Sequence, residues 1–309
     1  MNLEPSNQLY LFGHQENFIN LTNLYINKNF PNKILLSGEK GIGKSTLAFH
    51  LINYILSQDE EHMYNLEKFE INLENKSFKL LKNKSNPNFI LIDINEEKKS
   101  IDIGQIRNLI LTLNKSNFNK KPRLVLIDNI ELLNNNAVNA LLKILEEPGD
   151  NINFILINNN KKILPTLKSR CLNFNIKLTS GQSFEITSKL LNEKYSDLIN
   201  NEIINNYSTP GEILRLIDFS NNNDISLKKL NLKTLIQKLI TEKKYKKDNF
   251  IKLMIYSLIE KYFRNNISIS NITLIAFHKY FLKRINDTKL FNLDEEALFM
   301  EFESKILNG

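Results

Sequence analysis

The sequence KILLSGEKGIGKST, from Lys33 to Thr46, decides the fold of the first half of the chain. Within it, residues 38–45 fit the pattern G-x-x-x-x-G-K-[ST] at every fixed position. The apolar run 33–37 predicts a buried strand, and the apolar periodicity from Thr46 to Leu56 predicts a helix. A strand, a glycine-rich turn and a helix in this order make a chance match of the pattern a poor explanation.

The residue types in this turn suit the binding of a nucleoside triphosphate. Glycines let the backbone approach phosphate closely, and successive N–H groups at the start of a helix donate to the phosphate oxygens. Lys44 can neutralise the β- and γ-phosphates, and the Ser45 hydroxyl can coordinate Mg²⁺. The sequence therefore predicts a site for ATP and Mg²⁺ made by Gly38, Glu39, Lys40, Gly41, Ile42, Gly43, Lys44, Ser45 and Thr46.

The same alternation of strand and helix patterns continues along the chain. Apolar runs typical of buried strands occur at 88–94, 123–128 and 153–158, and helical periodicity occurs at 103–113 and 137–147. This order predicts an α/β fold, with a parallel sheet covered by helices on both faces.

The strand RLVLID ends in Asp128, and an aspartate at this place can hold Mg²⁺ through water. The next residue is Asn129, whose amide has no titratable proton acceptor. An active ATPase of this type usually has a carboxylate there to activate water. We therefore expect nucleotide binding to remain open to this chain, and its own ATPase activity to be weak or absent.

After about residue 177 the strand patterns stop and helical periodicity takes over. We predict three domains: an α/β nucleotide-binding domain at 1–177, a small helical lid at 178–222 and a helical bundle at 223–309. The bundle contains the basic cluster Lys243, Lys244, Lys246 and Lys247, which fits either a solvated helix face or contact with a phosphate backbone.

Composition excludes several classes of protein. Among 309 residues there are one cysteine, Cys171, and four scattered histidines, so we expect no disulfide and no zinc site. The N-terminus lacks the pattern of a signal peptide, and no apolar run is long enough for a membrane helix. The sequence favours a cytoplasmic protein without membrane contact.

Two further tracts carry a resemblance to a known family. NALLKILEEP (139–148) and LPTLKSRC (164–171) resemble the core of bacterial DNA polymerase III clamp-loader subunits. LFGHQ (11–15), Ile101-Asp102 and Gln105-Ile106-Arg107 also lie where that family has them. The resemblance implies an AAA+ P-loop domain, a helical lid and a helical collar through which five subunits form a ring. It also implies partners: gamma/tau and delta subunits, the sliding clamp, and primer-template DNA reached through the complex.

The resemblance assigns roles to residues that composition and spacing leave open. Ser169-Arg170-Cys171 resembles the motif whose arginine acts in trans as an arginine finger on ATP bound by a neighbouring subunit. The polar nucleotide-binding residue that ends the strand after the NALLKILEEP helix is Asn158 or Asn159, since the register is ambiguous by one residue.

Departures from the motor subunits of that family favour the delta-prime type. Position 129 is an amide, the zinc cysteines are missing, and Gly211 stands where the lid arginine is expected, although Arg215 one turn later can substitute for it. This implies a mostly non-hydrolysing stator in a DNA-directed DNA polymerase complex. The intact P-loop keeps two alternatives open: an active gamma/tau-type motor ATPase, and a stand-alone P-loop nucleotide-binding enzyme.

Overall fold

The structure is a computed structural model that describes residues 4–94, 100–115, 119–204, 208–246, 249–267, 272–291 and 293–308. These residues form two compact units. The first unit comprises the described residues up to Thr187 together with Thr209–Glu212, and the second comprises those of Ser188–Ser208 and from Ile213 onward.

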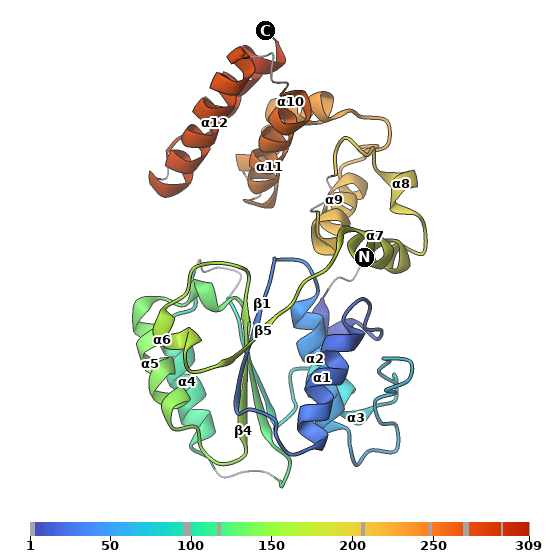
Figure 1. Cartoon of the computed structure of the whole chain (residues 1–309), viewed down its shortest axis with the longest axis vertical. Helices are drawn as coiled ribbons and strands as arrows, with labels where there is room; N and C mark the ends of the chain where they lie inside the picture. Colours follow the sequence, from blue (N-terminus) through green and yellow to red (C-terminus); the bar gives the residue numbers. More distant parts are fainter. Residues whose placement is uncertain are drawn as a thin grey trace. The chain divides into compact units, whose positions relative to one another are not determined.

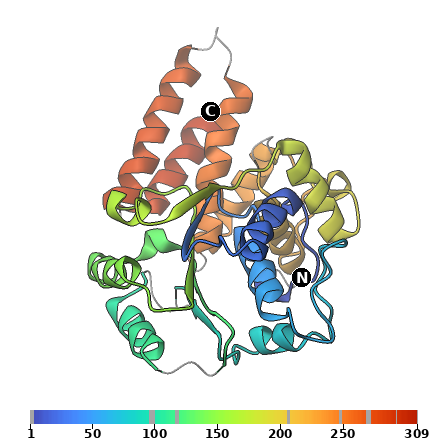
Figure 2. The same cartoon turned by 60° about the horizontal axis from the view of Figure 1, so that its bottom comes forward.

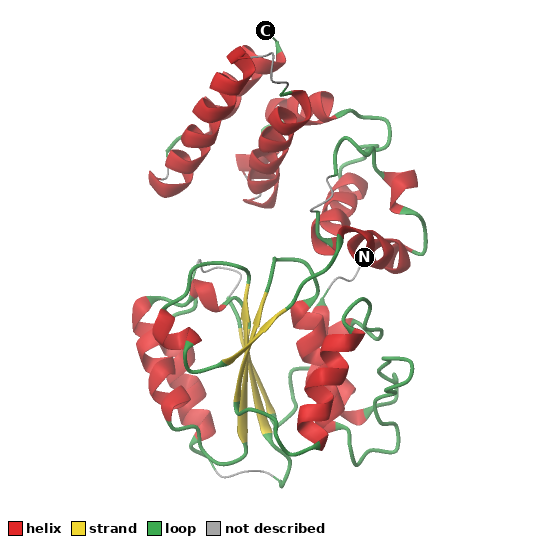
Figure 3. Ribbon diagram, viewed as in Figure 1, coloured by secondary structure: helices red, strands yellow, loops and turns green. Residues whose placement is uncertain are grey.

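The first unit is built on a parallel sheet of five strands in the order β2-β3-β4-β1-β5 (Figure 3). β1 lies between β4 and β5, so the strand that precedes the glycine-rich turn sits inside the sheet and not at its edge. The strands are β1 (Lys33–Ser37), β2 (Phe89–Ile92), β3 (Arg123–Ile127), β4 (Ile152–Asn158) and β5 (Leu172–Asn175).

Helices cover both faces of this sheet (Figure 1). One face carries α1, α2 and α3, and the other carries α4, α5 and α6. Their bounds are α1 (Gln15–Ile26), α2 (Lys44–Leu56), α3 (Lys76–Lys82), α4 (Ile103–Leu113), α5 (Asn135–Glu146) and α6 (Pro165–Lys168). The predicted α/β fold is thus confirmed.

Alternate residues of each central strand enter two separate hydrophobic cores. In β1, Ile34 and Leu36 pack with α1 and α2, whereas Leu35 packs with α4 and α5. In β4, Phe154 and Leu156 join the second of these cores. Because side chains alternate between the faces of a strand, a parallel sheet covered on both sides needs apolar residues at nearly every position.

Local signals fix where the helices begin. Asp102 and Gln105 form a reciprocal capping box at the start of α4, and the side chain of Asn134 accepts the Ala137 N–H at the start of α5. The family positions at 102 and 105 therefore have a structural explanation. The segment 58–87 is mostly turns, with α3 as its α-helix.

The second unit consists of helices joined by turns and irregular segments, with no strand among its described residues. Figure 2 shows α11 and α12 side by side, and rings from three helices meet in its core. The ring of Phe281 lies 5.9 Å from that of Phe263 and 5.2 Å from that of Phe302. The helices from residue 180 onward are α7 (Ser180–Leu191), α8 (Tyr195–Leu198), α9 (Pro210–Asn222), α10 (Leu232–Thr241), α11 (Asn249–Asn266), α12 (Ile272–Phe291) and α13 (Glu295–Phe302).

In the helical part, α9 continues to Asn222 and α10 begins at Leu232. In the basic cluster, Lys243 and Lys246 each lie 2.6 Å from the carboxylate of Glu296, and Lys247 lies outside the described residues. The division into a lid at 178–222 and a bundle at 223–309 stays a prediction. Among the described residues, no helix combines the length and apolarity needed to cross a membrane.

Phe154 gives a test of the sheet core. Its side chain is 0% exposed at the centre of β4, so Phe154→Ala should lower the free energy of unfolding by about 3–5 kcal/mol through lost burial and a cavity. Leu111→Ala on α4, where the side chain is 63% exposed, should change it by no more than about 0.5 kcal/mol. Urea denaturation followed by circular dichroism measures both. Equal effects of the two substitutions would contradict the assignment of Phe154 to the core.

Candidate nucleotide-binding site

The turn between β1 and α2 has the backbone that its glycines permit. Gly41 and Gly43 have φ angles of +87° and +94°, in the left-handed region that side chains disfavour. A Cβ at Gly38 would lie 2.3 Å from the Ile176 carbonyl oxygen, so no side chain fits there. The glycines of the predicted phosphate-binding loop are therefore required by its geometry.

Lys44 is buried beneath this loop, with only 3% of its surface exposed. Its ammonium donates to the carbonyl oxygens of Gly38 at 2.9 Å and Glu39 at 2.5 Å. Burial lowers the pKa of Lys44 to about 8, while the negative charges of Asp128 and Glu131 oppose this shift. Lys44 thus binds loop carbonyls in the free chain and is the cation that a phosphate would meet there.

Ser45 and Asp128 lie together, as the sequence predicts for a magnesium site. The Ser45 hydroxyl donates to Asp128 Oδ2 at 2.5 Å. Burial raises the pKa of Asp128, and the nearby Asp93 carboxylate raises it further. A hydroxyl and a carboxylate at the entrance of the loop are hard oxygen donors, so these residues fit Mg²⁺ bound with a nucleotide.

The side-chain amide of Asn129 is held by hydrogen bonds at both ends. Its backbone is left-handed, with φ of 54°, a conformation that asparagine tolerates better than most residues. Its Nδ2 donates to Asp93 Oδ1 at 2.8 Å, and its Oδ1 accepts from Asn159 Nδ2 at 2.8 Å. Both ends of the amide are therefore used in a polar network at the ends of β2, β3 and β4.

Asn159 joins a second carboxylate to this network. Its Nδ2 donates to Glu131 Oε1 at 2.8 Å, and its backbone N–H donates to Glu131 Oε2 at 3.3 Å. Asn158, the last residue of β4, instead bonds to the backbone of Lys161 through its side chain. The structure therefore brings Asn159 into contact with position 129, and places the Asn158 amide in a turn.

His14 is a buried side chain that is hydrogen-bonded to the loop. It is 1% exposed, and its Nε2–H donates to the Ile42 carbonyl oxygen at 2.5 Å. Burial lowers the pKa of His14 and so favours the neutral ring, whereas the hydrogen bond to the Ile42 carbonyl oxygen opposes this shift. His14 therefore helps to fix the conformation of the predicted phosphate-binding loop.

Thr209, just before α9, and Gly211, in its first turn, both donate hydrogen bonds to backbone carbonyl oxygens of the loop. The Gly211 N–H donates to the Gly41 carbonyl oxygen at 2.9 Å, and the Thr209 hydroxyl donates to the Lys40 carbonyl oxygen at 3.0 Å. A Cβ at Gly211 would lie 2.8 Å from Gly41 Cα, so an arginine cannot take this place without moving the backbone. Arg215 is exposed and belongs to the second unit.

Arg170 lies apart from the loop, in the turn between α6 and β5. Its guanidinium donates to the Thr166 carbonyl oxygen at 2.8 Å and pairs with the Glu146 carboxylate at the end of α5. The side chains of the pair are 31% and 53% exposed, so water reaches both. Arg170 is thus partly exposed and held by two contacts within its own unit.

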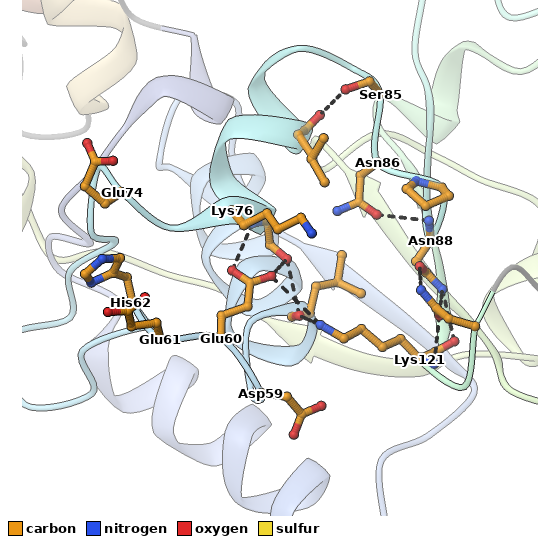
Figure 4. A pocket seen from close by; sticks show the side chains of 15 residues that line it. Asp59, Glu60, Glu61, His62, Glu74, Lys76, Ser85, Asn86, Asn88 and Lys121 are labelled. Carbon is orange, nitrogen blue, oxygen red and sulfur yellow. Dashed lines mark hydrogen bonds and ion pairs between the residues drawn. The ribbon is translucent and has the colours of Figure 1, made fainter.

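A polar depression of about 840 Å³ lies elsewhere, beside the irregular segment 58–87 (Figure 4). It contains none of the predicted site residues, and two of its charged groups bond to neighbouring residues. Glu60 accepts from Ser77, and Lys121 donates to the Leu56 carbonyl oxygen at 2.6 Å. Across the parts of the chain that the structure describes, no group of three or more His, Cys, Asp and Glu side chains could hold a metal ion.

With this geometry in place, comparison with known proteins identifies the family. The family described as "DNA polymerase III, delta subunit" matches residues 13–180, which include the loop, Asp128 and Arg170. The chain belongs to this family. The clamp-loader family predicted from NALLKILEEP and LPTLKSRC is thereby confirmed, and similar proteins named delta′ agree with the delta-prime type.

Two curated delta-family relatives and one solved structure give the extent of the similarity. A protein of Buchnera aphidicola subsp. Baizongia pistaciae named "DNA polymerase III subunit delta′" is 33% identical over 159 residues, or 49% of this chain and 45% of that protein. The Pseudomonas aeruginosa protein of the same name is 34% identical over 139 residues, or 45% and 40%. The matched region therefore spans less than half the length of these relatives.

The solved structure is a DNA polymerase III gamma subunit-related protein from Thermotoga maritima. It aligns with 92% of this chain and 97% of its own, with a TM-score of 0.51 and 18% identity. At this identity, the comparison shows that the two proteins share a fold.

Sequence reasoning missed three members of the site. Asp93, Glu131 and His14 were assigned no role, although Asp93 ends the strand NFILID just as Asp128 ends RLVLID. That repeated pattern is a signal that could have found Asp93. Glu131 lies two residues beyond the strand-ending amide, and its neighbour Asn159 is distant in sequence. Only the order of strands in the sheet brings them together.

The pKa of Lys44 leads to a prediction about pH. Phosphate favours the ammonium form, so binding should raise the pKa of Lys44 from about 8 towards its ordinary value of 10.5. The affinity for ATP and Mg²⁺ should fall as pH rises above 8, and binding should take up a proton in this range. Calorimetric titration in two buffers of different ionisation enthalpy measures the uptake.

Lys44→Arg is the matched control, because a guanidinium stays protonated throughout this range. It should bind nucleotide, if at all, without that proton uptake. The same uptake in both proteins would show that another group titrates.

Proposed function

We propose that the chain is a delta-prime subunit of a DNA polymerase III clamp loader, acting as a stator that supplies Arg170 to a neighbouring ATPase subunit. The observation that carries the proposal is the family match over residues 13–180, a region that holds a complete phosphate-binding loop and a partly exposed arginine in the same unit. The subunit would act while the complex loads the sliding clamp on primed DNA in the cytoplasm.

The pairing of Arg170 with Glu146 is compatible with this role. Ion pairs between partly exposed side chains contribute only about 0–1 kcal/mol. A phosphate group on a neighbouring subunit can offer the guanidinium a stronger, bidentate partner. The free chain can therefore hold Arg170 in place at little cost and release it in the assembled complex.

The site of the chain itself would bind ATP and Mg²⁺ without rapid turnover. Lys44 would hold the β- and γ-phosphates, and Ser45 and Asp128 would hold the metal, directly or through water. Bound Mg²⁺ would neutralise phosphate charge. The amide at position 129 and the glycine at 211 remove two charged groups that a motor subunit of this family uses, which supports a stator.

The helical second unit supports assembly with partner subunits. On α11, Ile255, Leu258 and Phe263 are buried inside the unit. Exposed apolar side chains of the unit include Leu253 on α11, and Ile272, Leu290 and Phe291 on α12. We propose that the segment 223–309 is the collar, in a pentameric ring with gamma/tau and delta subunits.

The intact loop favours one second candidate, an active motor of the gamma/tau type. Lys44 and Ser45 occupy the positions that such a motor needs, and Arg215 remains an alternative lid arginine. A stand-alone P-loop enzyme would need a pocket for an acceptor substrate, and the polar depression beside 58–87 contains none of the loop residues. The two remaining candidates differ in which residue of this chain limits ATP turnover.

Substituting Arg170 separates them. In a complex reconstituted with its partner subunits, Arg170→Ala should lower the DNA-stimulated ATPase rate of the neighbouring site, where loss of an arginine finger costs about 10³–10⁵-fold. Assembly and nucleotide binding by this chain should not change. Lys168→Ala removes an exposed cation two residues away and should behave as the unsubstituted protein.

Lys44→Ala completes the test. It should remove nucleotide from this chain with little effect on clamp loading, because the stator does not depend on its own turnover. An inactive Lys44→Ala complex together with a fully active Arg170→Ala complex would identify the chain as a motor.

A further inference from the structure

The network at the ends of β2, β3 and β4 contains a carboxylate that the proposed function does not use. Glu131 lies in the short turn of 3-10 helix at Ile130–Leu132, directly after the left-handed Asn129. That backbone turn carries position 131 back towards the end of β4. Glu131 is therefore part of the nucleotide site, although it lies two residues beyond the position where a motor has its glutamate.

Glu131 is held in a defined orientation. Each of its oxygens accepts one N–H of Asn159, from the side-chain amide at 2.8 Å and from the backbone at 3.3 Å. The Asn159 amide also donates to Asn129 Oδ1 at 2.8 Å, so residues 129, 131 and 159 are fixed relative to one another. A carboxylate held by two donors keeps free lone pairs, which can accept a proton from water.

The charge of Glu131 acts on the phosphate-binding lysine. The negative charges of Asp128 and Glu131 both oppose the lowering of the Lys44 pKa by burial. The Gly38 N–H donates to the Asn158 carbonyl oxygen at 3.2 Å, which joins the loop to the residue before Asn159. Through Asn159 and the Asn158 carbonyl oxygen, Glu131 is thus linked to the first residue of the loop, and its Oε1 shares the Asn159 amide donor with Asn129 Oδ1.

The other two carboxylates of the site are less suited to accept a proton. Asp128 accepts from the Ser45 hydroxyl and from the Asn129 N–H, and it is the residue placed to hold the metal. Asp93 Oδ1 accepts from both Asn129 Nδ2 and the Ile94 N–H. Glu131 is the member of the three that has a fixed orientation, shares its donor with Asn129 and is not placed to hold the metal.

We propose that Glu131 is the proton acceptor for the water that attacks a nucleotide bound at Gly38–Ser45, in place of the carboxylate missing at position 129. The proposal rests on the nucleotide binding proposed above and goes beyond the stator role. It gives this chain a slow hydrolytic activity of its own, limited in the isolated protein because no neighbour contributes an arginine.

The step balances without any further reactant. The water oxygen forms a bond to the γ-phosphorus, and the bond from that phosphorus to the β,γ-bridging oxygen breaks. The electron pair of the broken bond stays on the leaving ADP, and one water proton moves to the Glu131 carboxylate. Release of that proton to solvent and of phosphate and ADP restores the site.

The experiment measures single-turnover hydrolysis, with the full-length chain in excess over γ-phosphate-labelled ATP and Mg²⁺ present. Glu131→Gln keeps the size of the side chain and removes the proton acceptor, so hydrolysis should fall by about 10²-fold, the usual contribution of such a group. Glu131→Asp keeps a carboxylate at a shorter reach and should retain a measurable part of the rate.

Controls separate a loss of chemistry from a loss of binding or folding. Glu67→Gln, at an exposed position in the segment 58–87, should hydrolyse ATP as the unsubstituted chain does. A fluorescent ATP analogue measures affinity, which should change less than threefold in Glu131→Gln, and thermal melting checks the fold of each variant. Glu131→Asp keeps the proposal testable if the glutamine variant is unstable.

Three outcomes of this experiment would overturn the proposal. Hydrolysis by Glu131→Gln within threefold of the unsubstituted rate overturns the proposal. So does nucleotide binding by the unsubstituted chain with hydrolysis no faster than that of Lys44→Ala, and in that case the proposed binding site stands. Absence of nucleotide binding overturns both.

Discussion

Parallel pairing of β1 with β4 is the constraint on which the rest of the site depends. It places the end of β1, where the glycine-rich turn begins, beside the end of β4, and the Gly38 N–H closes the pair by donating to the Asn158 carbonyl oxygen. β3 pairs with the other edge of β4, so Asp128 reaches the same edge of the sheet. Because parallel strands all end at one edge, residues distant in sequence meet there without any long loop. The apolar residues that hold these strands between two helical layers are thus also what positions the polar ones.

Much of this could be predicted from the sequence, and the reason differs from element to element. The loop was predictable because its glycines, Lys44 and Ser45 act through local backbone geometry, which a short motif records. Asp128 was predictable because it follows a buried strand by one residue. The contact between Glu131 and Asn159 was not, since it depends on which strands are neighbours and on the left-handed turn at Asn129. The register left open between positions 158 and 159 is of the same kind, because a one-residue difference decides which amide faces β3.

Burial and mutual attraction shift the pKa values of Lys44 and Asp128 in opposite directions. Burial lowers the pKa of Lys44 and raises that of Asp128, so desolvation acts against the charged form of each. Their mutual attraction and the Ser45 hydroxyl work in the other direction, as does the charge of Glu131 on Lys44. A polyphosphate with its metal would supply the missing charges on both sides. The free site is therefore arranged for a ligand that carries negative charge for the lysine and a cation for the aspartate.

The contact between Gly41 and Gly211 has a consequence for how a bound ligand would act on α9. It is made of backbone atoms, with one hydrogen bond and no room for a Cβ on either glycine. An arginine reaching for a phosphate would instead link the helix to the ligand through charge, and dissolved salt weakens such a link when it is exposed. In this chain the first turn of α9 is tied to the loop itself. The coupling between them should thus be nearly indifferent to ionic strength, whether or not the loop holds a nucleotide.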